Sequence, residues 1–434
     1  MKPAILVWND LPQNRKDYYL KRSESDISDV MDSVSVIINT VKDKGDKALF
    51  DYTNKFDRVD LTGKSLRVSK EEFDEAEKNL PKKIKSALEY AIDNIWKFHK
   101  TQKPSGMNFD ELRPGLFAGE KAIPIESAGL YVPRGRGSFP SMLYMLAVPA
   151  AVAGVERICV ITPPGEDGEV DPACLYAAKL CGIEEVYRVG GAHGIAALAY
   201  GTESIPSVNK ITGPGSMYVT AAKRILSGTV DVGLPAGPSE SIILSDGRAD
   251  PWSLALDLLV EAEHGSDSSA ILITTSLNLA EKTASFIEQL ISDLGEPRKT
   301  FVSDVFKGYG AIFLVETLEE GADLVNKFAP EHLQLKTKEP FSTLSLIKNA
   351  GEILLGENIP FSAANYVTGV NAVLPTGGNA KTYSAVSVRD FIKYSSVVYV
   401  DKNGYNDFKD HVITLADYEG FETHGNALKL REKV

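Results

Sequence analysis

The sequence predicts an α/β protein with two sheets built mainly of parallel strands, and three observations lead to this expectation. A chain of 434 residues is longer than one ordinary hydrophobic core requires, so two or three domains are expected. Its 43% hydrophobic and 24% charged residues are typical of a globular protein. Short apolar runs repeatedly end in Gly or Pro and lead into helical patterns, which indicates βα units.

The first part of the chain is predicted to be helical over residues 27–105. Apolar residues recur at three-to-four spacing in residues 30–42 and 82–99, before residues 103–106 break the pattern. Four β-rich runs follow at residues 129–133, 157–163, 185–190 and 209–213. Each run leads through a glycine-containing loop toward a helical pattern, so they are expected to form one parallel sheet.

A second series of βα units begins after residues 235–240. Its predicted strands are residues 241–244, 270–275, 311–315 and 352–355, and its predicted helices are residues 252–263 and 277–294. Residues 387–434 are predicted to be mostly helical. The expected organisation is an N-terminal segment (1–26), one α/β domain (27–129 with 238–386), a second α/β domain inserted into it (130–237), and a C-terminal helical segment (387–434).

Charge and composition exclude several classes of protein. The net charge of −12 argues against a general nucleic-acid binder or a protein of anionic membranes. The first twenty residues contain no apolar signal-peptide core, and residues 142–155 are too few to span a bilayer. Cys159, Cys174 and Cys181 are expected to be buried free thiols in a reducing cytoplasm, with a catalytic cysteine as the alternative.

Three of the six histidines lie close to glutamates in sequence, which indicates a metal site or a proton-transferring pair. Chance proximity is the alternative. Asp250 and Pro251 open a helix that Gly265 is placed to end, so Glu261 and His264 project from one face near its C-terminus. This pair could hold a metal with ligands from elsewhere, or His264 could simply be favoured by the helix dipole.

The second pair, Glu331 and His332, follows Ala329 and Pro330 and is predicted to begin a helix. At that position the helix dipole would keep the imidazole neutral and able to accept a proton, while Glu331 polarises a water molecule. A solvent-facing histidine at a helix start is the alternative. The third pair is Glu422 and His424.

Glycine loops follow three of the predicted strands, at residues 135–137, 190–194 and 213–215. Backbone N–H groups in such loops suit a phosphate or carboxylate. None of the loops is a GxGxxG motif, and tight βα turns use glycine in any case, so the loops alone are weak evidence for a dinucleotide.

Taken together, these segments resemble the histidinol dehydrogenase family. The matching motifs lie at residues 128–133, 189–192, 195–203, 213–215, 218–220, 234–240, 262–265, 329–333 and 373–376 and at His424. They run in order through nearly the whole chain. The resemblance implies two related, incomplete Rossmann-like domains, small terminal segments, an intertwined homodimer with shared active sites, a zinc ion (or similar divalent metal), and NAD-dependent oxidation of an alcohol through an aldehyde to a carboxylate.

The resemblance also assigns roles to individual residues. Glu331 and His332 match the family's acid/base pair, and His332 is also expected to contact substrate. His264 and His424 match zinc ligands, the second supplied by the partner subunit. Ser239 and Glu419 match substrate-contacting positions; Tyr131, His193 and Ser216 stand at NAD-contacting positions.

The departures from the family pattern concern the metal and the substrate. The family's glutamine ligand is Glu261 here, and its aspartate ligand is Asn365. Because the two changes are reciprocal, the ligand charge is unchanged, and we expect a rearranged metal site of Glu261, His264, Asn365 and His424, with Asn365 also near the substrate; a lost site is the alternative.

A third departure has no visible compensation: the family's substrate-contacting histidine is Ala372. At the NAD-contacting positions His193 and Ser216 replace the family's Gln and Asn, and Arg134 and Arg136 could meet a phosphate or an anionic substrate, or could face solvent.

These observations predict an NAD- and metal-dependent dehydrogenase of a small polar primary alcohol, with L-histidinol as the family's default substrate. The alternatives are a paralogue acting on another amino alcohol, polyol or anionic alcohol, a non-catalytic family member that binds metal or ligand, and a metal-dependent hydrolase on the same scaffold. Neither nucleic acid nor membrane is expected as a partner.

Overall fold

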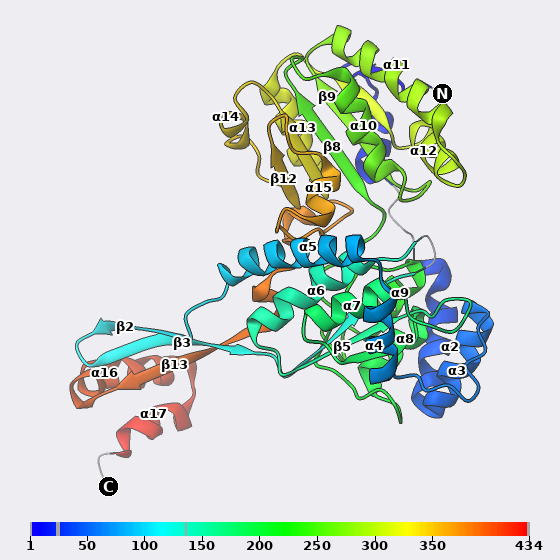
Figure 1. Ribbon diagram of the computed structural model, residues 1–434. Helices are drawn as coiled ribbons and strands as arrows, with labels where there is room; N and C mark the ends of the chain where they lie inside the picture. The colour runs from blue at the N-terminus through cyan, green and yellow to red at the C-terminus, as the bar shows by residue number, and fades with distance from the viewer. Residues whose placement is uncertain (1, 23–26, 135–136, 432–434) are drawn as a thin grey trace. The chain divides into compact units, whose positions relative to one another are not determined.

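The computed structural model describes residues 2–22, 27–134 and 137–431, which fall into two units (Figure 1). The first unit comprises Met1–Gln102 and Ile125–Phe391, and the second comprises Lys103–Pro124 and Ile392–Val434. The first unit contains two parallel sheets and the second an antiparallel sheet.

Within the described residues, six strands form the larger parallel sheet, in the order β1-β10-β9-β8-β11-β12. They are β1 (Ile5–Val7), β8 (Glu240–Ser245), β9 (Ser269–Thr274), β10 (Ala311–Leu314), β11 (His332–Lys336) and β12 (Glu352–Leu355). Apolar side chains of α10 (Pro251–Ala262), α11 (Leu277–Asp293) and α12 (Arg298–Lys307) pack on one face. Helices α1 (Gln13–Lys21) and α13 (Leu318–Phe328) cover the other, so the central strands are buried on both sides, as parallel strands usually are.

The smaller parallel sheet has four strands among the described residues, in the order β6-β5-β4-β7. They are β4 (Ser127–Tyr131), β5 (Arg157–Thr162), β6 (Glu185–Arg188) and β7 (Lys210–Thr212). Helices α8 (Gly191–Tyr200) and α9 (Met217–Leu226) are backed by α2 (Ser28–Lys44) and α3 (Asp46–Asp57). Helices α6 (Pro140–Ala153) and α7 (Pro172–Leu180) are backed by α4 (Lys70–Asn79) and α5 (Lys82–Lys100).

The N-terminal helices pack differently from the sequence-based expectation that grouped residues 27–129 with 238–386. The apolar face of α2, including Val34, Ile38 and Val41, shares one hydrophobic core with Ile161 of β5 and Ile211 of β7. These helices therefore belong with the four-stranded sheet, because their buried faces are completed by that sheet's helices.

Both parallel sheets have incomplete Rossmann-like topology, as expected. In each, the strand order reverses beside the first strand of the series, between β4 and β7 in one sheet and between β8 and β11 in the other. At the carboxyl edge of such a sheet, the point of reversal leaves a crevice in which ligands commonly bind.

The second unit corrects the prediction for the C-terminal segment. Helices α16 (Lys402–Glu419) and α17 (Glu422–Lys429) confirm the predicted helical character, but β13 (Ile392–Val400) is a strand. It pairs antiparallel with β3 (Leu116–Pro124), which also pairs with β2 (Met107–Arg113). The β-branched and aromatic residues of β13 fit this pairing, which connects segments far apart in sequence that a local pattern does not link.

The predicted helix start at residues 329–332 is wrong. Ala329 ends α13 in the left-handed conformation (φ +52°), and His332 begins β11, which is inserted between β8 and β12. Along β11, Leu333 and Leu335 face one hydrophobic core while the alternating polar side chains face α10, where the Lys336 ammonium lies 3.5 Å from the Asp257 carboxylate. Burial between two strands thus overrides the helix-start pattern.

Two further expectations concern burial. Cys159, Cys174 and Cys181 are free thiols and are buried, as predicted. In the part of the chain that the structure describes, no helix combines the length and apolar character needed to cross a bilayer.

His193, at the start of α8, is packed against α3 and is only 1% exposed. Its ring lies near the rings of Tyr52 and Phe56, and its Nε2 atom is 3.5 Å from the Thr53 hydroxyl oxygen. Burial lowers the pKa of His193 to about 3, so the folded protein holds a neutral imidazole.

This buried histidine predicts acid sensitivity. The unfolded chain binds the proton with a pKa of about 6.5, so stability is lost as pH falls below that value toward 3. Between pH 7 and pH 4.5 the loss from this group should be about 2–3 kcal/mol, and His193→Gln should lack it. Urea unfolding at both pH values measures the difference, with the exposed His411→Gln as control; equal losses in wild type and His193→Gln would contradict the prediction.

Candidate active site

Seven residues singled out from the sequence line one cavity of about 140 Å³ in the first unit. They are Ser239, Glu261, His264, Glu331, His332, Asn365 and Ala372. They come from the amino edge of the six-stranded sheet and its connecting helices, including α15 (Phe361–Tyr366). Pro214 and residues of α6 form the opposite wall, next to the carboxyl edge of the four-stranded sheet.

His332 is oriented by the strand that carries it. It pairs in register with Glu352, the first residue of β12, and its Nδ1 atom lies 2.9 Å from the Glu352 carboxylate. This contact directs Nε2 toward two other carboxylates, 3.9 Å from Glu261 and 3.8 Å from Glu331. The side chain is 3% exposed, so the imidazole has one defined orientation, with Nε2 facing the cavity's acidic groups.

Glu331 is held by the neighbouring strand. Its Oε2 atom accepts a hydrogen bond of 2.9 Å from the backbone N–H of Glu240, the first residue of β8. Burial raises the pKa of Glu331 to about 8, with further upward contributions from Glu261 and Glu240, although His332 and the backbone N–H oppose the shift. Such a carboxyl group can exchange a proton near neutral pH.

Glu261 and Asn365, the two exchanged positions, contact each other directly. The Asn365 amide nitrogen donates a hydrogen bond of 2.7 Å to Glu261 Oε1, while Glu261 Oε2 lies 3.3 Å from His264 Nδ1. As predicted, Glu261 lies in the last turn of α10, but the helix ends at Ala262 rather than at Gly265, so His264 lies in the turn that follows it. Asp250 caps the start of that helix by accepting from the Ser253 N–H.

The site carries excess negative charge. Four buried carboxylates, those of Glu240, Glu261, Glu331 and Glu352, are close to Arg22 and to His332 in the described chain. Burial alone would lower the pKa of His332. The three neighbouring carboxylates of Glu261, Glu331 and Glu352 outweigh that effect and raise the pKa of His332 to about 10. With Arg22 and His332 both positive, one negative charge stays uncompensated within this set while Glu331 is protonated, and two when Glu331 ionises, so a divalent cation would offset the excess.

The donor atoms fit such a cation. Because the Asn365 amide nitrogen faces Glu261, its carbonyl oxygen is left buried without a hydrogen-bond partner in the described chain. A carboxylate, an imidazole and a carboxamide oxygen thus converge at the cavity. No group of three His, Cys, Asp or Glu side chains capable of holding a metal occurs among the described residues, so the site needs the carboxamide and a further ligand.

The predicted NAD-contacting residues follow three strands of the other sheet at its carboxyl edge. Tyr131 is the last residue of β4, His193 lies in the first turn of α8 after β6, and the exposed Ser216 precedes α9 after β7. A side chain at Gly213 would place its Cβ 2.1 Å from the Tyr131 carbonyl oxygen, so only glycine allows this close approach of the two strand ends.

Arg134 lies at the same edge, beside a cavity of about 770 Å³. Its guanidinium donates a hydrogen bond of 3.1 Å to the Glu169 carbonyl, and Asp57 and Pro163 line the same cavity. Arg136, the other arginine predicted for this loop, lies outside the described residues.

The remaining predicted residues, Glu419 and His424, belong to the second unit. Glu419 ends α16, and His424 lies in the first turn of α17, where its ring packs 5.1 Å from that of Phe421. Both side chains are exposed.

Two residues of the site were missed by the sequence analysis. Glu352 was assigned only to a strand, and Glu240 only to a motif. A carboxylate at the first position of a parallel strand beside a histidine-bearing strand is a usable signal, but only once β11 is known to be a strand.

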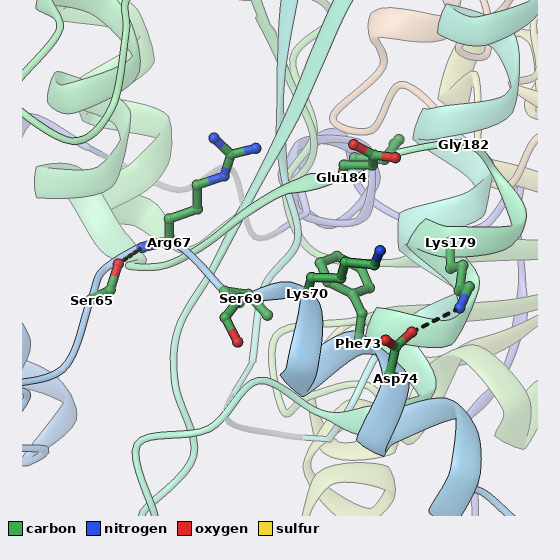
Figure 2. Close-up of a pocket in the computed structure, with 11 residues that line it drawn as sticks. Ser65, Arg67, Ser69, Lys70, Phe73, Asp74, Lys179, Gly182 and Glu184 are labelled. Carbon is green, nitrogen blue, oxygen red and sulfur yellow. Dashed lines mark hydrogen bonds and ion pairs between the residues drawn. The ribbon is translucent and has the colours of Figure 1, made fainter.

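A separate cavity of about 550 Å³ lies between α4 and the end of α7 (Figure 2). Its described lining contains none of the predicted site residues. Lys179 at its rim is paired with Asp74 and Glu77. The concentration of buried ionisable groups therefore places the candidate active site at the smaller cavity.

Comparisons with known proteins identify the family of the chain. The family model described as histidinol dehydrogenase matches residues 20–432. The chain is 49% identical to a histidinol dehydrogenase of Synechocystis sp., covering 99% of both chains, and 48% identical to a histidinol dehydrogenase homolog of Colwellia psychrerythraea, covering 100% of this chain and 98% of that one. The crystal structure of histidinol dehydrogenase from Elizabethkingia anophelis superposes with a TM-score of 0.94 at 36% identity, covering 99% of this chain and 98% of that chain. The chain therefore belongs to the histidinol dehydrogenase family, whose members are NAD-dependent oxidoreductases acting on CH–OH donors.

Proposed function

We propose that this protein oxidises a small polar primary alcohol to the carboxylate in two NAD-dependent steps, with L-histidinol as its first candidate substrate. The observation that carries the proposal is the orientation of His332. With Nδ1 held by Glu352, Nε2 faces the cavity beside Glu261 and Glu331, where a proton acceptor for a substrate hydroxyl is required.

Different side chains of the site are assigned to metal binding and to proton transfer. A divalent cation such as zinc, held by Glu261, His264 and Asn365, would polarise the substrate hydroxyl as a Lewis acid and offset the negative charge around His332. With that charge offset, His332 accepts the hydroxyl proton at Nε2. NAD supplies the hydride acceptor in both oxidations. The ionised form of Glu331, which is available near its pKa of about 8, lies 3.8 Å from His332 Nε2 and accepts a proton from the water that adds to the aldehyde.

Cofactor and substrate approach from opposite walls of the site in this proposal. NAD lies along the carboxyl edge of the four-stranded sheet, near Tyr131 and Ser216, with Arg134 close enough to its cavity to meet a phosphate. The buried His193 side chain does not reach this edge, so only the backbone at the start of α8 is available to the cofactor there. Ser239, His332 and Asn365 contact the substrate across the cavity.

A second copy of the chain completes the site. His424 and Glu419, exposed in their own unit, are proposed to act as metal ligand and substrate contact in the partner of a homodimer. His264 and Asn365 also line a neighbouring cavity of about 460 Å³, which gives such a segment access to the metal ligands. The buried free cysteines agree with a reducing cytoplasm as the protein's location.

The direct test is NADH formation by zinc- or manganese-loaded protein with NAD+ and L-histidinol. Two NADH per alcohol are expected, and chelation of the metal should abolish turnover. His332→Asn should lower kcat by about 10²–10⁴-fold while NAD+ still binds, because only the proton acceptor is removed. Turnover without NAD+, or kcat unchanged in His332→Asn, would contradict the proposed chemistry.

A different alcohol substrate is the second candidate, and Ala372 is the observation that favours it. Ala372 lines the cavity where the resemblance leads us to expect a histidine, so a hydrogen-bonding group for substrate is missing. If L-histidinol is a poor substrate, Ala372→His should raise its kcat/KM by about 10–100-fold. High activity of wild type with L-histidinol, unaffected by this change, would exclude the second candidate.

The Glu261–Asn365 contact predicts coupled metal binding. Glu261→Gln removes a charged ligand and should weaken metal affinity by at least about 10–100-fold. The double variant Glu261→Gln/Asn365→Asp returns the carboxylate to the pair and should restore about one metal per subunit.

Elemental analysis and competition with a chromogenic chelator measure both effects, and the exposed neighbour Glu263→Gln serves as control. Unchanged affinity in Glu261→Gln would remove Glu261 from the ligand set. Failure of the double variant to recover metal would show that the two positions do not exchange roles.

A further inference from the structure

Arg22, near the N-terminus, is buried beside the candidate active site. It is 7% exposed and closes α1 with a backbone φ of +54°, a conformation that residues other than glycine seldom adopt. Its Nε atom lies 2.8 Å from Glu240 Oε1, and its guanidinium carbon lies 3.6 Å from the centre of the Phe328 ring. A strained backbone and a buried charge at one position indicate that the surrounding contacts determine its place.

The guanidinium contacts both the backbone that leads to Glu331 and the residue that donates a hydrogen bond to its carboxylate. Its Nη2 atom donates hydrogen bonds to the carbonyl oxygens of Phe328, at 2.6 Å, and Ala329, at 3.3 Å. Ala329 lies two residues before Glu331. Through Nε the guanidinium fixes Glu240, whose own backbone N–H donates to the Glu331 carboxylate at 2.9 Å. Both the backbone leading to Glu331 and the hydrogen-bond donor on its side chain therefore depend on Arg22.

The Glu240 carboxylate also contacts the loop that contains Gly377. Its Oε1 atom also accepts a hydrogen bond of 2.8 Å from the Gly377 N–H. The preceding residue, Thr376, accepts at its hydroxyl from the Gly237 N–H at 2.6 Å. Ser239 lies between Gly237 and Glu240, and the loop from Ala372 to Leu374 leads to Gly377, so two walls of the cavity are joined at this carboxylate.

We propose that Arg22 is a positioning residue that sets the Glu331 carboxylate for the water-activating step, acting through Glu240 and the 328–329 carbonyls. The role of Glu331 in activating water rests on the proposed function, whereas the effect of Arg22 on the position of the Glu331 carboxylate does not. Arginine suits the task because its planar fork reaches a carboxylate and two carbonyls at fixed angles, whereas an ammonium group is a single point of charge.

The test compares Arg22→Met and Arg22→Lys with Arg188→Met. Arg188 is a matched control because it is a buried arginine, 1% exposed, that pairs with Glu72 and Glu169 beside the four-stranded sheet. Loss of a buried cation should destabilise both methionine variants. Only Arg22→Met should lose kcat, by about 10–100-fold, with KM for alcohol and NAD+ nearly unchanged, since a misplaced reacting group affects turnover more than binding.

Two further measurements identify Glu331 as the group through which Arg22 acts. In the Glu331→Gln background, Arg22→Met should cause less than about a threefold further loss, because the two changes remove the same contribution. Arg22→Lys should recover part of kcat. A full additional loss in the double variant, or an equal loss of kcat in Arg188→Met, would overturn the proposal.

Crystal structures of the variants separate this proposal from the proposed function, because they require no turnover. The contact between Glu240 N and Glu331 Oε2 should be lost in Arg22→Met and kept in Arg188→Met. If Arg22→Met does not fold, Glu240→Gln, which keeps the shape and removes the ion pair, replaces it. An intact contact in the Arg22 variant would refute the positioning role even if the enzyme oxidises alcohols as proposed.

Discussion

The candidate active site depends on the insertion of β11 between β8 and β12. Parallel pairing on both sides places His332 level with Ser241 on one neighbour and Glu352 on the other. That register brings the Glu352 carboxylate to one imidazole nitrogen and turns the other toward the end of α10. A shift of β11 by one residue would turn His332 into the apolar core on the opposite face. The register that packs the sheet correctly therefore also fixes the position of His332 in the site.

The second constraint is electrostatic. Burying several carboxylates together is costly unless counter-charges are supplied, and Arg22 supplies one of them at Glu240. On the cavity side, Glu261 is close to His332, to His264 and to the amide of Asn365. In the proposed metal site, the reciprocal Glu261/Asn365 exchange would preserve the sum of ligand charges, so the chain would still suit a divalent cation.

Much of the fold could be predicted because strands of parallel sheets are short apolar runs between glycine loops, and these patterns are local. Strand β11 could not, because its polar residues His332, Gln334 and Lys336 are buried against α10 rather than exposed, and Pro330 imitates a helix start. Strand β13 depended on pairing with a segment far away in sequence. For the site, the motifs brought together Glu261, His264, Glu331, His332 and Asn365, whereas Glu240, Glu352 and Arg22 act through contacts that only the packed chain reveals.

The most direct test of this account is a crystal structure of protein purified without chelator, with anomalous data collected at the zinc edge. The account predicts one peak per subunit within about 2.0–2.3 Å of a Glu261 oxygen, a His264 nitrogen and the Asn365 carbonyl oxygen, completed by His424 of a second copy. A peak at another place, or none in protein that oxidises its alcohol, would contradict the rearranged metal site on which the proposed chemistry rests.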